Sequence, residues 1–303
     1  MSDNENKTLP SADATKDTPV AMNRNMLILV GAAIAILCAL VAGFFFYLKQ
    51  PAQSSGEQSA PITFKNKQEF VNAVAEAFDE IVAQRQKQEA QIKLQNYALA
   101  PAEPTERNIY GNTQARFSLV EFSDLECPYC KRLHPTPKAI VEGSKGNVNW
   151  EWMHLPLDFH NPVARTEAIA AECAGSIGGN RTFWAYIHEV FEQSQGGGRA
   201  LPDLHGIAAS LAVDKDAFAT CLAEERFAAK VDEQTRRAAT LGISGTPATF
   251  VVDNLTGKQE LISGARPVQA ILAVIAKLKA ESEEADPAIA QDPNAAPAAP
   301  QAQ

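Results

Sequence analysis

The sequence predicts an α/β fold: a small sheet with helices packed on it and an all-helical domain inserted into its middle. Three observations support this prediction. Short runs rich in β-branched and aromatic residues stand on both sides of a long block with helical periodicity. A Cys-x-x-Cys pair lies where the first run passes into a helix. One more amphipathic helix follows the last two runs.

Only part of the 303 residues is expected to form this domain. Residues 1–25 are polar without an apolar period, and residues 283–303 form an Ala/Pro/Gln-rich tail; both are predicted to be disordered because they cannot bury enough apolar surface to offset the entropy of ordering. The domain is predicted at 108–282, with its helical insertion at about 161–241. The net charge of −9 argues against nucleic acid as a partner.

Residues 26–48 are uncharged, and their length suffices to cross the ~30 Å hydrocarbon core of a bilayer. The alternative is a secretory signal peptide, whose apolar stretch is typically about 7–15 residues and ends in a small-residue cleavage site. This run is longer and ends in the bulky residues 44–47. We therefore expect an uncleaved transmembrane anchor. Lys and Arg are nearly balanced on its two sides, which leaves its orientation open.

A linker rich in Ser, Gly, Gln and Pro is expected at 49–65, followed by a helix at 66–97. Large apolar residues recur at helical spacing on one side of this helix: Phe70, Val74, Phe78 and Ile81. Two interpretations remain open. The stripe packs on the chain's own domain, or it makes the helix an oligomerisation element, since the Pro-containing segment 100–106 separates the helix from the domain.

Within the domain, the elements are predicted in the following order. Strands are expected at 117–122, 148–154, 248–253 and 258–263. Five helices are expected between the second and third strands, at about 163–174, 181–193, 204–211, 215–223 and 226–241. Asp214 is placed to cap the fourth of them. A last helix begins at Pro267 and ends at about Ser282.

Cys127 and Cys130 follow the first predicted strand directly, in the order Cys-Pro-Tyr-Cys. Cys127 is thus expected at the N-terminus of the next helix, with Pro128 in the first turn, where its missing N–H is not needed. Unpaired backbone N–H groups and the helix dipole favour the thiolate of Cys127 there. Cys130, one turn into the helix, lies farther from solvent.

Such a pair can be a metal clip, a structural disulfide or a redox pair. A structural zinc site needs four ligands, and neither a second Cys pair nor a His pair accompanies this one. We therefore expect no metal. His134, which follows closely, is expected on the surface or behind the pair rather than as a ligand.

Glu121 stands inside the otherwise apolar first strand, where a buried carboxylate is costly unless it has a partner or a task. Two interpretations are open: the carboxylate accepts and returns the proton of Cys130 during exchange, or it is an ordinary solvent-facing glutamate on an exposed strand. Far downstream, Thr246–Pro247 directly precedes a strand, where a trans proline fits poorly and a cis peptide bond would explain the placement.

Three motifs together resemble the DsbA-like branch of the thioredoxin superfamily: LVEFSDLECPYCKRLHP, FWAYIHEVF and LGISGTPATFVVD, in this order over residues 108–282. The resemblance implies a thioredoxin fold and a protein thiol-disulfide oxidoreductase that needs no cofactor beyond its redox-active cysteine pair. It implies that Cys127 is the nucleophile and Cys130 the resolving cysteine. It makes Glu121 the buried acid and Thr246–Pro247 the loop that pairs with substrate backbone.

The resemblance also implies a location and partners. The chain is expected to be a single-pass protein of a bacterial inner membrane, with a cytoplasmic N-terminus and a periplasmic catalytic domain. Its expected partners are substrate proteins with thiols or disulfides and a membrane redox partner that recycles the pair. Further copies of the chain are possible partners only on the oligomerisation interpretation of the 66–97 helix. Cys173 and Cys221, both on helices of the insertion, are expected to form a structural disulfide; the alternative is two unlinked core residues.

The direction of the reaction is the least determined expectation. The dipeptide is Pro-Tyr rather than the Pro-His of the strongest oxidases, and Thr246 before the proline resembles the isomerase-type relatives. Disulfide formation is favoured because the inserted helical domain is that of the oxidase branch, with isomerase or reductase activity as the alternative. A membrane-tethered chaperone or assembly factor without redox turnover is the alternative of another class.

Overall fold

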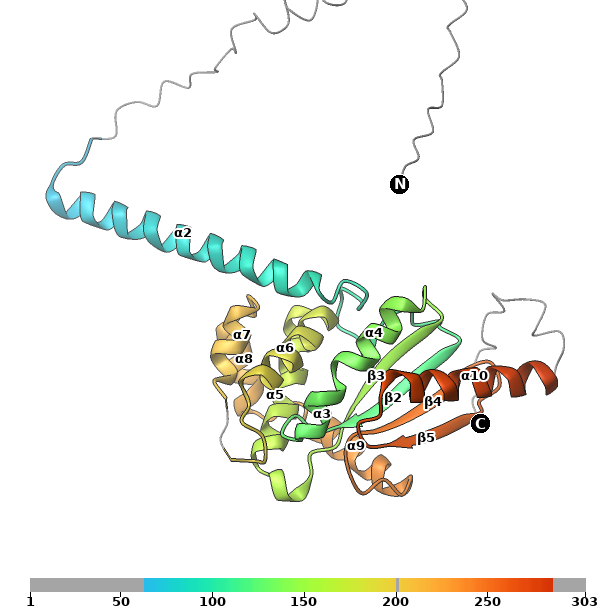
Figure 1. Ribbon diagram of the computed structural model, residues 1–303. Coiled ribbons are helices and arrows are strands. Elements are labelled where there is room, and N and C mark those ends of the chain that lie inside the picture. The colour runs from blue at the N-terminus through green and yellow to red at the C-terminus, as the bar shows by residue number, and fades with distance from the viewer. Residues whose placement is uncertain (1–62, 200–201, 286–303) are drawn as a thin grey trace, which may run out of the picture. The chain divides into compact units, whose positions relative to one another are not determined.

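The computed structural model describes residues 63–199 and 202–285 (Figure 1). The chain divides into the units Met1–Glu69 and Phe70–Gln303, and the description below concerns the second. The predicted anchor at 26–48, the segment 1–25 for which disorder was predicted, and most of the predicted linker lie outside the described residues, as does the tail from 286 onward. Among the helices of the described part, none is both long and apolar enough to cross a membrane.

A five-stranded mixed sheet forms the centre of the domain, in the order β1-β3-β2-β4-β5. Its strands are β1 (Asn108–Tyr110), β2 (Phe117–Ser123), β3 (Val148–His154), β4 (Ala248–Asp253) and β5 (Gln259–Ser263). β2 and β3 are parallel, and the other neighbours are antiparallel. Four of the strands were predicted. β1 was not, because three residues are too few to show a period.

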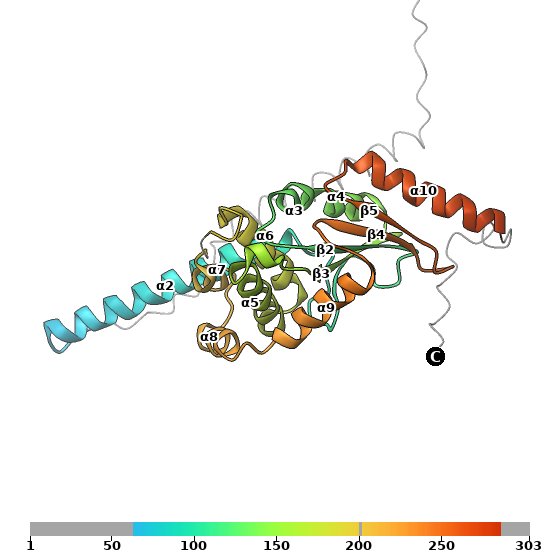
Figure 2. The same cartoon turned by 90° about the horizontal axis from the view of Figure 1, so that it is seen from below.

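The helices cover both faces of this sheet. Their bounds are α2 Lys67–Gln95, α3 Pro128–Leu133, α4 Pro135–Gly143, α5 Val163–Gly178, α6 Asn180–Gln193, α7 Leu204–Ser210, α8 Lys215–Ala223, α9 Ala228–Thr240 and α10 Val268–Ala285, with a 3₁₀ turn η1 at Asp158–His160. Figure 2 shows α4 and α10 on one side of the sheet and α9 on the other. The helices α5 to α8 form the inserted domain, and α6 contacts the edge strand β1.

Because both faces are covered, β3 is buried along its whole length despite its polar residues. Trp150 and Trp152 point to one face and pack with Trp184 of α6, with ring centroids 4.3 Å apart for Trp150 and Trp184. Glu151 points to the other face, where Arg107 holds it through a contact of 2.8 Å between Nε and Oε1. The alternating pattern therefore reflects two buried layers of different polarity.

The helical insertion is joined internally by a disulfide between Cys173 of α5 and Cys221 of α8, whose Cα atoms are 5.9 Å apart. The alternative of two unlinked cysteines is thus wrong. The cap prediction for α8 is confirmed, since the Asp214 carboxylate accepts from the backbone N–H of Ala217 at 2.8 Å. At the C-terminus, α10 runs to Ala285, slightly beyond the predicted start of the tail.

The helix α2 packs on the domain only near its C-terminal end, where Ala90 is buried and Lys93 pairs with Glu189 at 3.0 Å. Farther from that end, the apolar side chains of the stripe are exposed. Phe78 and Ile81 are each 64% exposed. The structure therefore does not support the interpretation in which the stripe packs on the chain's own domain.

Candidate active site

The cysteine pair lies where β2 passes into α3. Cys127 is the N-cap residue of α3, and Pro128 occupies the first turn. Both cysteines are free thiols in this structure. The Cys127 N–H donates to the carbonyl oxygen of Asp124 at 3.1 Å, and the Asp124 N–H donates to Cys130 Sγ at 3.5 Å. The short loop before the helix thus holds both sulfurs.

The two thiols differ sharply in their acidity. The hydrogen bond with the Cys130 thiol is the largest cause that lowers the pKa of Cys127 to about 5; the Thr246 side chain and the backbone N–H groups of Tyr129 and Cys130 lower it further, against the opposing effect of burial. The Thr246 hydroxyl is buried without another hydrogen-bond partner, which leaves it available to the thiolate. Burial raises the pKa of Cys130 well above its usual range, and the charges of Cys127 and Glu121 raise it further.

Glu121 of β2 lies beneath the pair and is fully buried, so the solvent-facing interpretation is wrong. Neither of its carboxylate oxygens makes a hydrogen bond. Burial raises the pKa of Glu121 to about 7, and the nearby polar groups of Ser123 and Trp150 only partly oppose this effect. A carboxyl group with a pKa near neutrality gains or loses a proton at little cost, as a proton acceptor for Cys130 requires.

The loop before β4 faces the pair from the other side. The Thr246–Pro247 peptide bond is cis. The Cys127 thiol donates to the carbonyl oxygen of Thr246 at 3.5 Å, which joins two positions far apart in the sequence. A pocket of about 310 Å³ lies along this loop and reaches Leu261 and Ser263 of β5. The structure therefore brings Glu121 and the Thr246–Pro247 loop to the two cysteines of the pair.

Of the two places expected for His134, the surface is wrong, because the side chain is buried. It is buried beneath α6, with its ring stacked on that of His188 and close to those of Trp150 and Phe191. Burial lowers its pKa to about 3, so the ring is neutral. No local pattern around His134 indicates this burial, because the covering helix α6 begins only at Asn180. In the described ranges, no three His, Cys, Asp or Glu side chains are grouped to hold a metal ion.

Two acidic residues that sequence reasoning missed lie directly before Cys127. Asp124 is buried, and its Oδ2 accepts from the backbone N–H of Leu157 at 2.9 Å and lies 2.7 Å from the His160 ring. Glu126 is also buried and accepts from the backbone N–H of Gly198 at 2.6 Å. Acidic residues in a loop are usually solvated, which is why the stretch SDLEC did not single them out. They tie two neighbouring loops to the redox pair.

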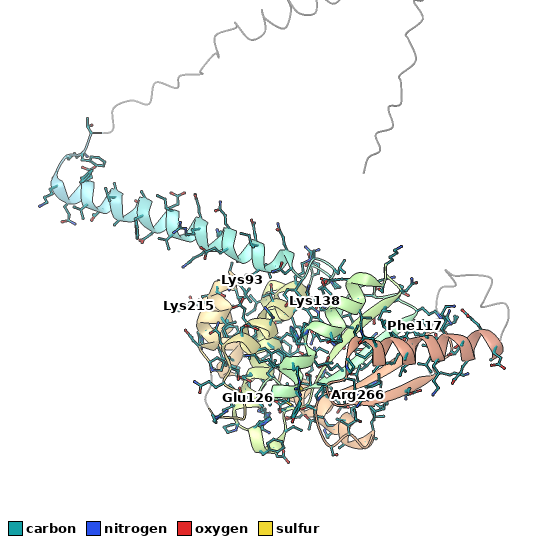
Figure 3. The ribbon with its side chains drawn as sticks, in the orientation of Figure 1. Lys93, Phe117, Glu126, Lys138, Lys215 and Arg266 are labelled. Carbon is teal, nitrogen blue, oxygen red and sulfur yellow. A yellow bond between two sulfur atoms is a disulfide. The ribbon has the colours of Figure 1, made fainter. Side chains whose placement is uncertain are left out.

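A third buried acid, Glu167 of α5, lies beside Glu126. Burial and the charges of Glu126 and Asp124 raise the pKa of Glu167 to about 9, so this side chain is protonated at neutral pH. The acids behind the pair therefore do not repel one another with full charge. In Figure 3, Glu126 marks the end of β2 at which this cluster lies, and Phe117 marks the opposite end.

Comparison with known proteins agrees with this arrangement. The family model described as Thioredoxin matches residues 103–263. Among solved structures, DsbA2 of Pseudomonas aeruginosa is similar with a TM-score of 0.52 and 33% identity, covering 59% of this chain and 97% of that one. A variant of α-DsbA1 of Wolbachia pipientis has a TM-score of 0.51 at 20% identity, covering 63% and 98%, which supports the fold alone.

The curated relatives that match in sequence are longer proteins. The Na(+)/H(+) antiporter NhaA 1 of Salinispora arenicola is 35% identical over 153 residues, which are 50% of this chain and 22% of that protein. The antiporter NhaA of Herminiimonas arsenicoxydans is 30% identical over 153 residues and 23% of its length. The chain spans less than a quarter of these relatives, so their names describe proteins of which it matches only a part.

Proposed function

Because this chain belongs to the thioredoxin family and has the fold of DsbA-type thiol-disulfide oxidoreductases, we propose that it oxidises thiols of extracytoplasmic proteins to disulfides. The observation that supports this proposal best is the asymmetry of the pair. With a pKa of about 5, Cys127 is a thiolate at neutral pH, whereas Cys130 keeps its proton. A thiolate this stable favours the reduced pair and therefore makes the oxidised pair a strong oxidant.

Oxidation of a substrate then takes two exchange steps. A substrate thiolate attacks Cys127 Sγ of the oxidised pair; the Cys127–Cys130 bond breaks, and Cys130 leaves as a thiolate that takes the proton of Glu121. A second substrate thiolate attacks the substrate sulfur of the mixed disulfide, and Cys127 leaves as its stable thiolate. The substrate loses two electrons as its disulfide forms, and the pair gains them.

Glu121 fits the proton transfer in this sequence for two reasons. Its buried position puts it beside Cys130 rather than beside solvent, and its pKa of about 7 lets it give up a proton to the leaving Cys130 thiolate. The carboxylate must recover its proton when the pair is reoxidised. The cis-Pro loop supplies the backbone of Thr246 next to Cys127, where an extended substrate segment would pair with it.

The direction of the reaction is tested with one multi-disulfide substrate in two forms, reduced and scrambled. We expect the oxidised protein to refold the reduced form quickly and the scrambled form slowly. Rescue of the scrambled form, with little activity on the reduced one, would instead identify an isomerase. The strongly lowered pKa of Cys127 favours oxidation.

A chaperone or assembly factor without redox turnover is the second candidate class. The exposed apolar side chains of α2 favour it, since they could hold unfolded chains. Replacing both cysteines of the pair by alanine separates the classes. An oxidoreductase loses all thiol oxidation, whereas a chaperone keeps its suppression of client aggregation.

We also propose that residues 26–48 anchor the chain in a bacterial inner membrane, with the catalytic domain in the periplasm. The uncharged run and the Cys173–Cys221 disulfide support this location, because structural disulfides form in oxidising compartments. A membrane redox partner would then reoxidise the pair. Reporter fusions behind residue 60 test the orientation: alkaline phosphatase, which needs the periplasm, should be active there.

Self-association through α2 completes the proposal. Val74, Phe78 and Ile81 repeat at coiled-coil spacing and are 51%, 64% and 64% exposed, which is unusual for a stripe of large apolar side chains. A second copy of the chain would cover them.

A further inference from the structure

A pocket of about 480 Å³ lies beside α3, where the turn after α2, the start of α4 and the last turns of α6 meet. Its volume is within the range of about 300–1,000 Å³ that is usual for small-molecule sites. Lys131 and Arg132 of α3, Lys138 of α4 and His188 of α6 are among its lining residues. The exchange chemistry of the cysteine pair does not use this pocket.

Aromatic rings form the inner wall of the pocket. Tyr97, His134 and Phe191 line it, and each is at most 4% exposed. The ring of the half-buried His188 stacks on that of His134, with centroids 5.7 Å apart, and lies 6.2 Å from that of Tyr97. Rings pack favourably at centroid distances of about 4.5–7 Å. A flat aromatic ligand would therefore find a surface of matching shape here.

His134 is the polar group of this inner wall, and neither of its ring nitrogens has a hydrogen-bond partner. A buried polar group without a partner is costly and uncommon in native proteins. Because burial lowers the pKa of His134, the ring is neutral and has one N–H donor and one acceptor nitrogen. A hydroxyl group at the inner end of a ligand would supply the missing partner, since it both donates and accepts.

The rim of the pocket is cationic, although the whole chain has a net charge of −9. Among the described residues that line the pocket, three cations stand against the single carboxylate of Glu192. Lys138 pairs with Glu142. Lys131 and Arg132 form no ion pair within the described part of the chain. Two exposed cations are thus available to a negative charge from outside the chain.

We propose that this pocket binds a small phenolic acid, meaning an aromatic ring with a carboxylate at one end and a hydroxyl group at the other. The ring packs on Tyr97 and His188, the carboxylate pairs with Lys131 and Arg132, and the hydroxyl group bonds to His134. A small molecule fits better than an acidic peptide because the aromatic wall is recessed behind the charged rim. This ligand site is independent of the proposed function.

The rim contact is tested by NMR titration of the full-length protein in non-ionic detergent with para-hydroxybenzoate, and with para-hydroxybenzamide as its uncharged counterpart. Lys131→Gln removes a rim charge, and Lys131→Arg keeps it. Lys215→Gln is the matched control, because Lys215 is an exposed lysine of α8 that does not line the pocket and lies apart from Lys138 in Figure 3.

We expect Lys131→Gln to raise the Kd of para-hydroxybenzoate about three- to tenfold, between the usual effects of a surface ion pair and of a charged hydrogen bond. Lys131→Arg and Lys215→Gln should leave this Kd unchanged, and the benzamide should bind the unaltered protein more weakly. Equal Kd values for Lys131→Gln and Lys215→Gln would refute the site. So would binding of a glutamate-rich peptide in place of the phenolic acid.

The inner contact is tested with benzoate, which lacks the hydroxyl group. The unaltered protein should bind para-hydroxybenzoate about three- to tenfold more tightly than benzoate, as expected for one hydrogen bond. His134→Phe keeps a ring but removes both nitrogens, and it should abolish this preference. A preference that survives in His134→Phe would refute the contact with His134.

A measurement on the unaltered protein locates the ligand without any substitution. Addition of para-hydroxybenzoate should shift the ring Cε1–H resonances of His134 and His188, because the bound ring lies against both. The resonance of His205, on α7 and in contact with Phe218, should not move. Equal shifts at all three histidines, or no shift at the first two, would overturn the proposal. None of these measurements requires turnover of the cysteine pair, so loss of the proposed function would leave the site standing.

Discussion

Replacement of Glu121 by glutamine should make the protein more stable at neutral and basic pH while it slows exchange. In the folded, reduced protein the pKa of this carboxyl group is about 7, against an ordinary value of 4.5. The unfolded chain therefore loses the proton first as the pH rises, and the folded state loses stability between about pH 4.5 and 7. At 1.36 kcal/mol per pKa unit, the loss is about 3 kcal/mol.

Glu121→Gln removes this titration and keeps the shape of the side chain. We expect it to gain about 3 kcal/mol in the free energy of unfolding relative to the unaltered protein at pH 8, and to gain little at pH 4. Urea unfolding of the reduced protein in detergent across this range gives the difference. Glu284→Gln, at an exposed position of α10, controls for removal of a charge and should show no such slope. A pH-independent difference for Glu121→Gln would refute the raised pKa.

The same variant should show what the carboxyl group does for exchange. Without it, the Cys130 thiolate must obtain its proton from water in a site that is closed to solvent. We expect the step that releases Cys130 to slow by about 10²-fold, the lower end of the usual contribution of a positioned acid or base. Single-turnover oxidation of a peptide dithiol measures this step. An unchanged single-turnover rate for Glu121→Gln would show that Glu121 has no part in the proton transfer.

Three further expectations follow. Ultraviolet absorbance of the thiolate in the reduced protein should give a pKa near 5 for Cys127. Cys130→Ala should raise this pKa, because the Cys130 thiol is the contact that stabilises the Cys127 thiolate most. A pKa at the ordinary ~8.5 for Cys127 in the unaltered protein would contradict the site chemistry. Phe78→Glu in the full-length protein should yield monomers by light scattering where the unaltered protein associates, whereas equal masses would exclude association through α2. Loss of the Cys173–Cys221 bond, which closes a separation of 48 residues, should cost about 4 kcal/mol of stability, measured by urea unfolding of the double alanine variant; a loss below about 1 kcal/mol would contradict this estimate.

The local part of the site was predictable from the sequence because it depends on neighbouring residues. A cysteine pair at the start of a helix, a proline in its first turn and a glutamate within an apolar strand are visible in one short segment. The role of Thr246–Pro247 as the substrate-pairing loop was implied only by the resemblance to a known family, and its contact with Cys127 was not predicted, because no local pattern connects residues so distant along the chain.

The missed features all depend on long-range packing. Asp124 and Glu126 look like solvated loop residues until the loops at Leu157 and Gly198 close over them. His134 is a polar residue that its sequence neighbours alone would place on the surface, and the packing of α6 buries it. Burial of a polar residue is decided by elements that come later in the chain, and periodicity within a short window does not report it.

The Cys173–Cys221 disulfide bears on how such a protein is made. Both sulfurs are fully buried between α5 and α8, so the thiolate of a finished molecule does not reach them. If the chain exchanges disulfides as proposed, this burial protects its own structural disulfide from attack by Cys127. Because the closed insertion shields both sulfurs, we expect the bond to form before α5 and α8 pack together, by an oxidant other than the chain's own redox pair. Each newly made molecule would then depend on an oxidant that is already present in the compartment where it folds. The protein could not generate its own first structural disulfide.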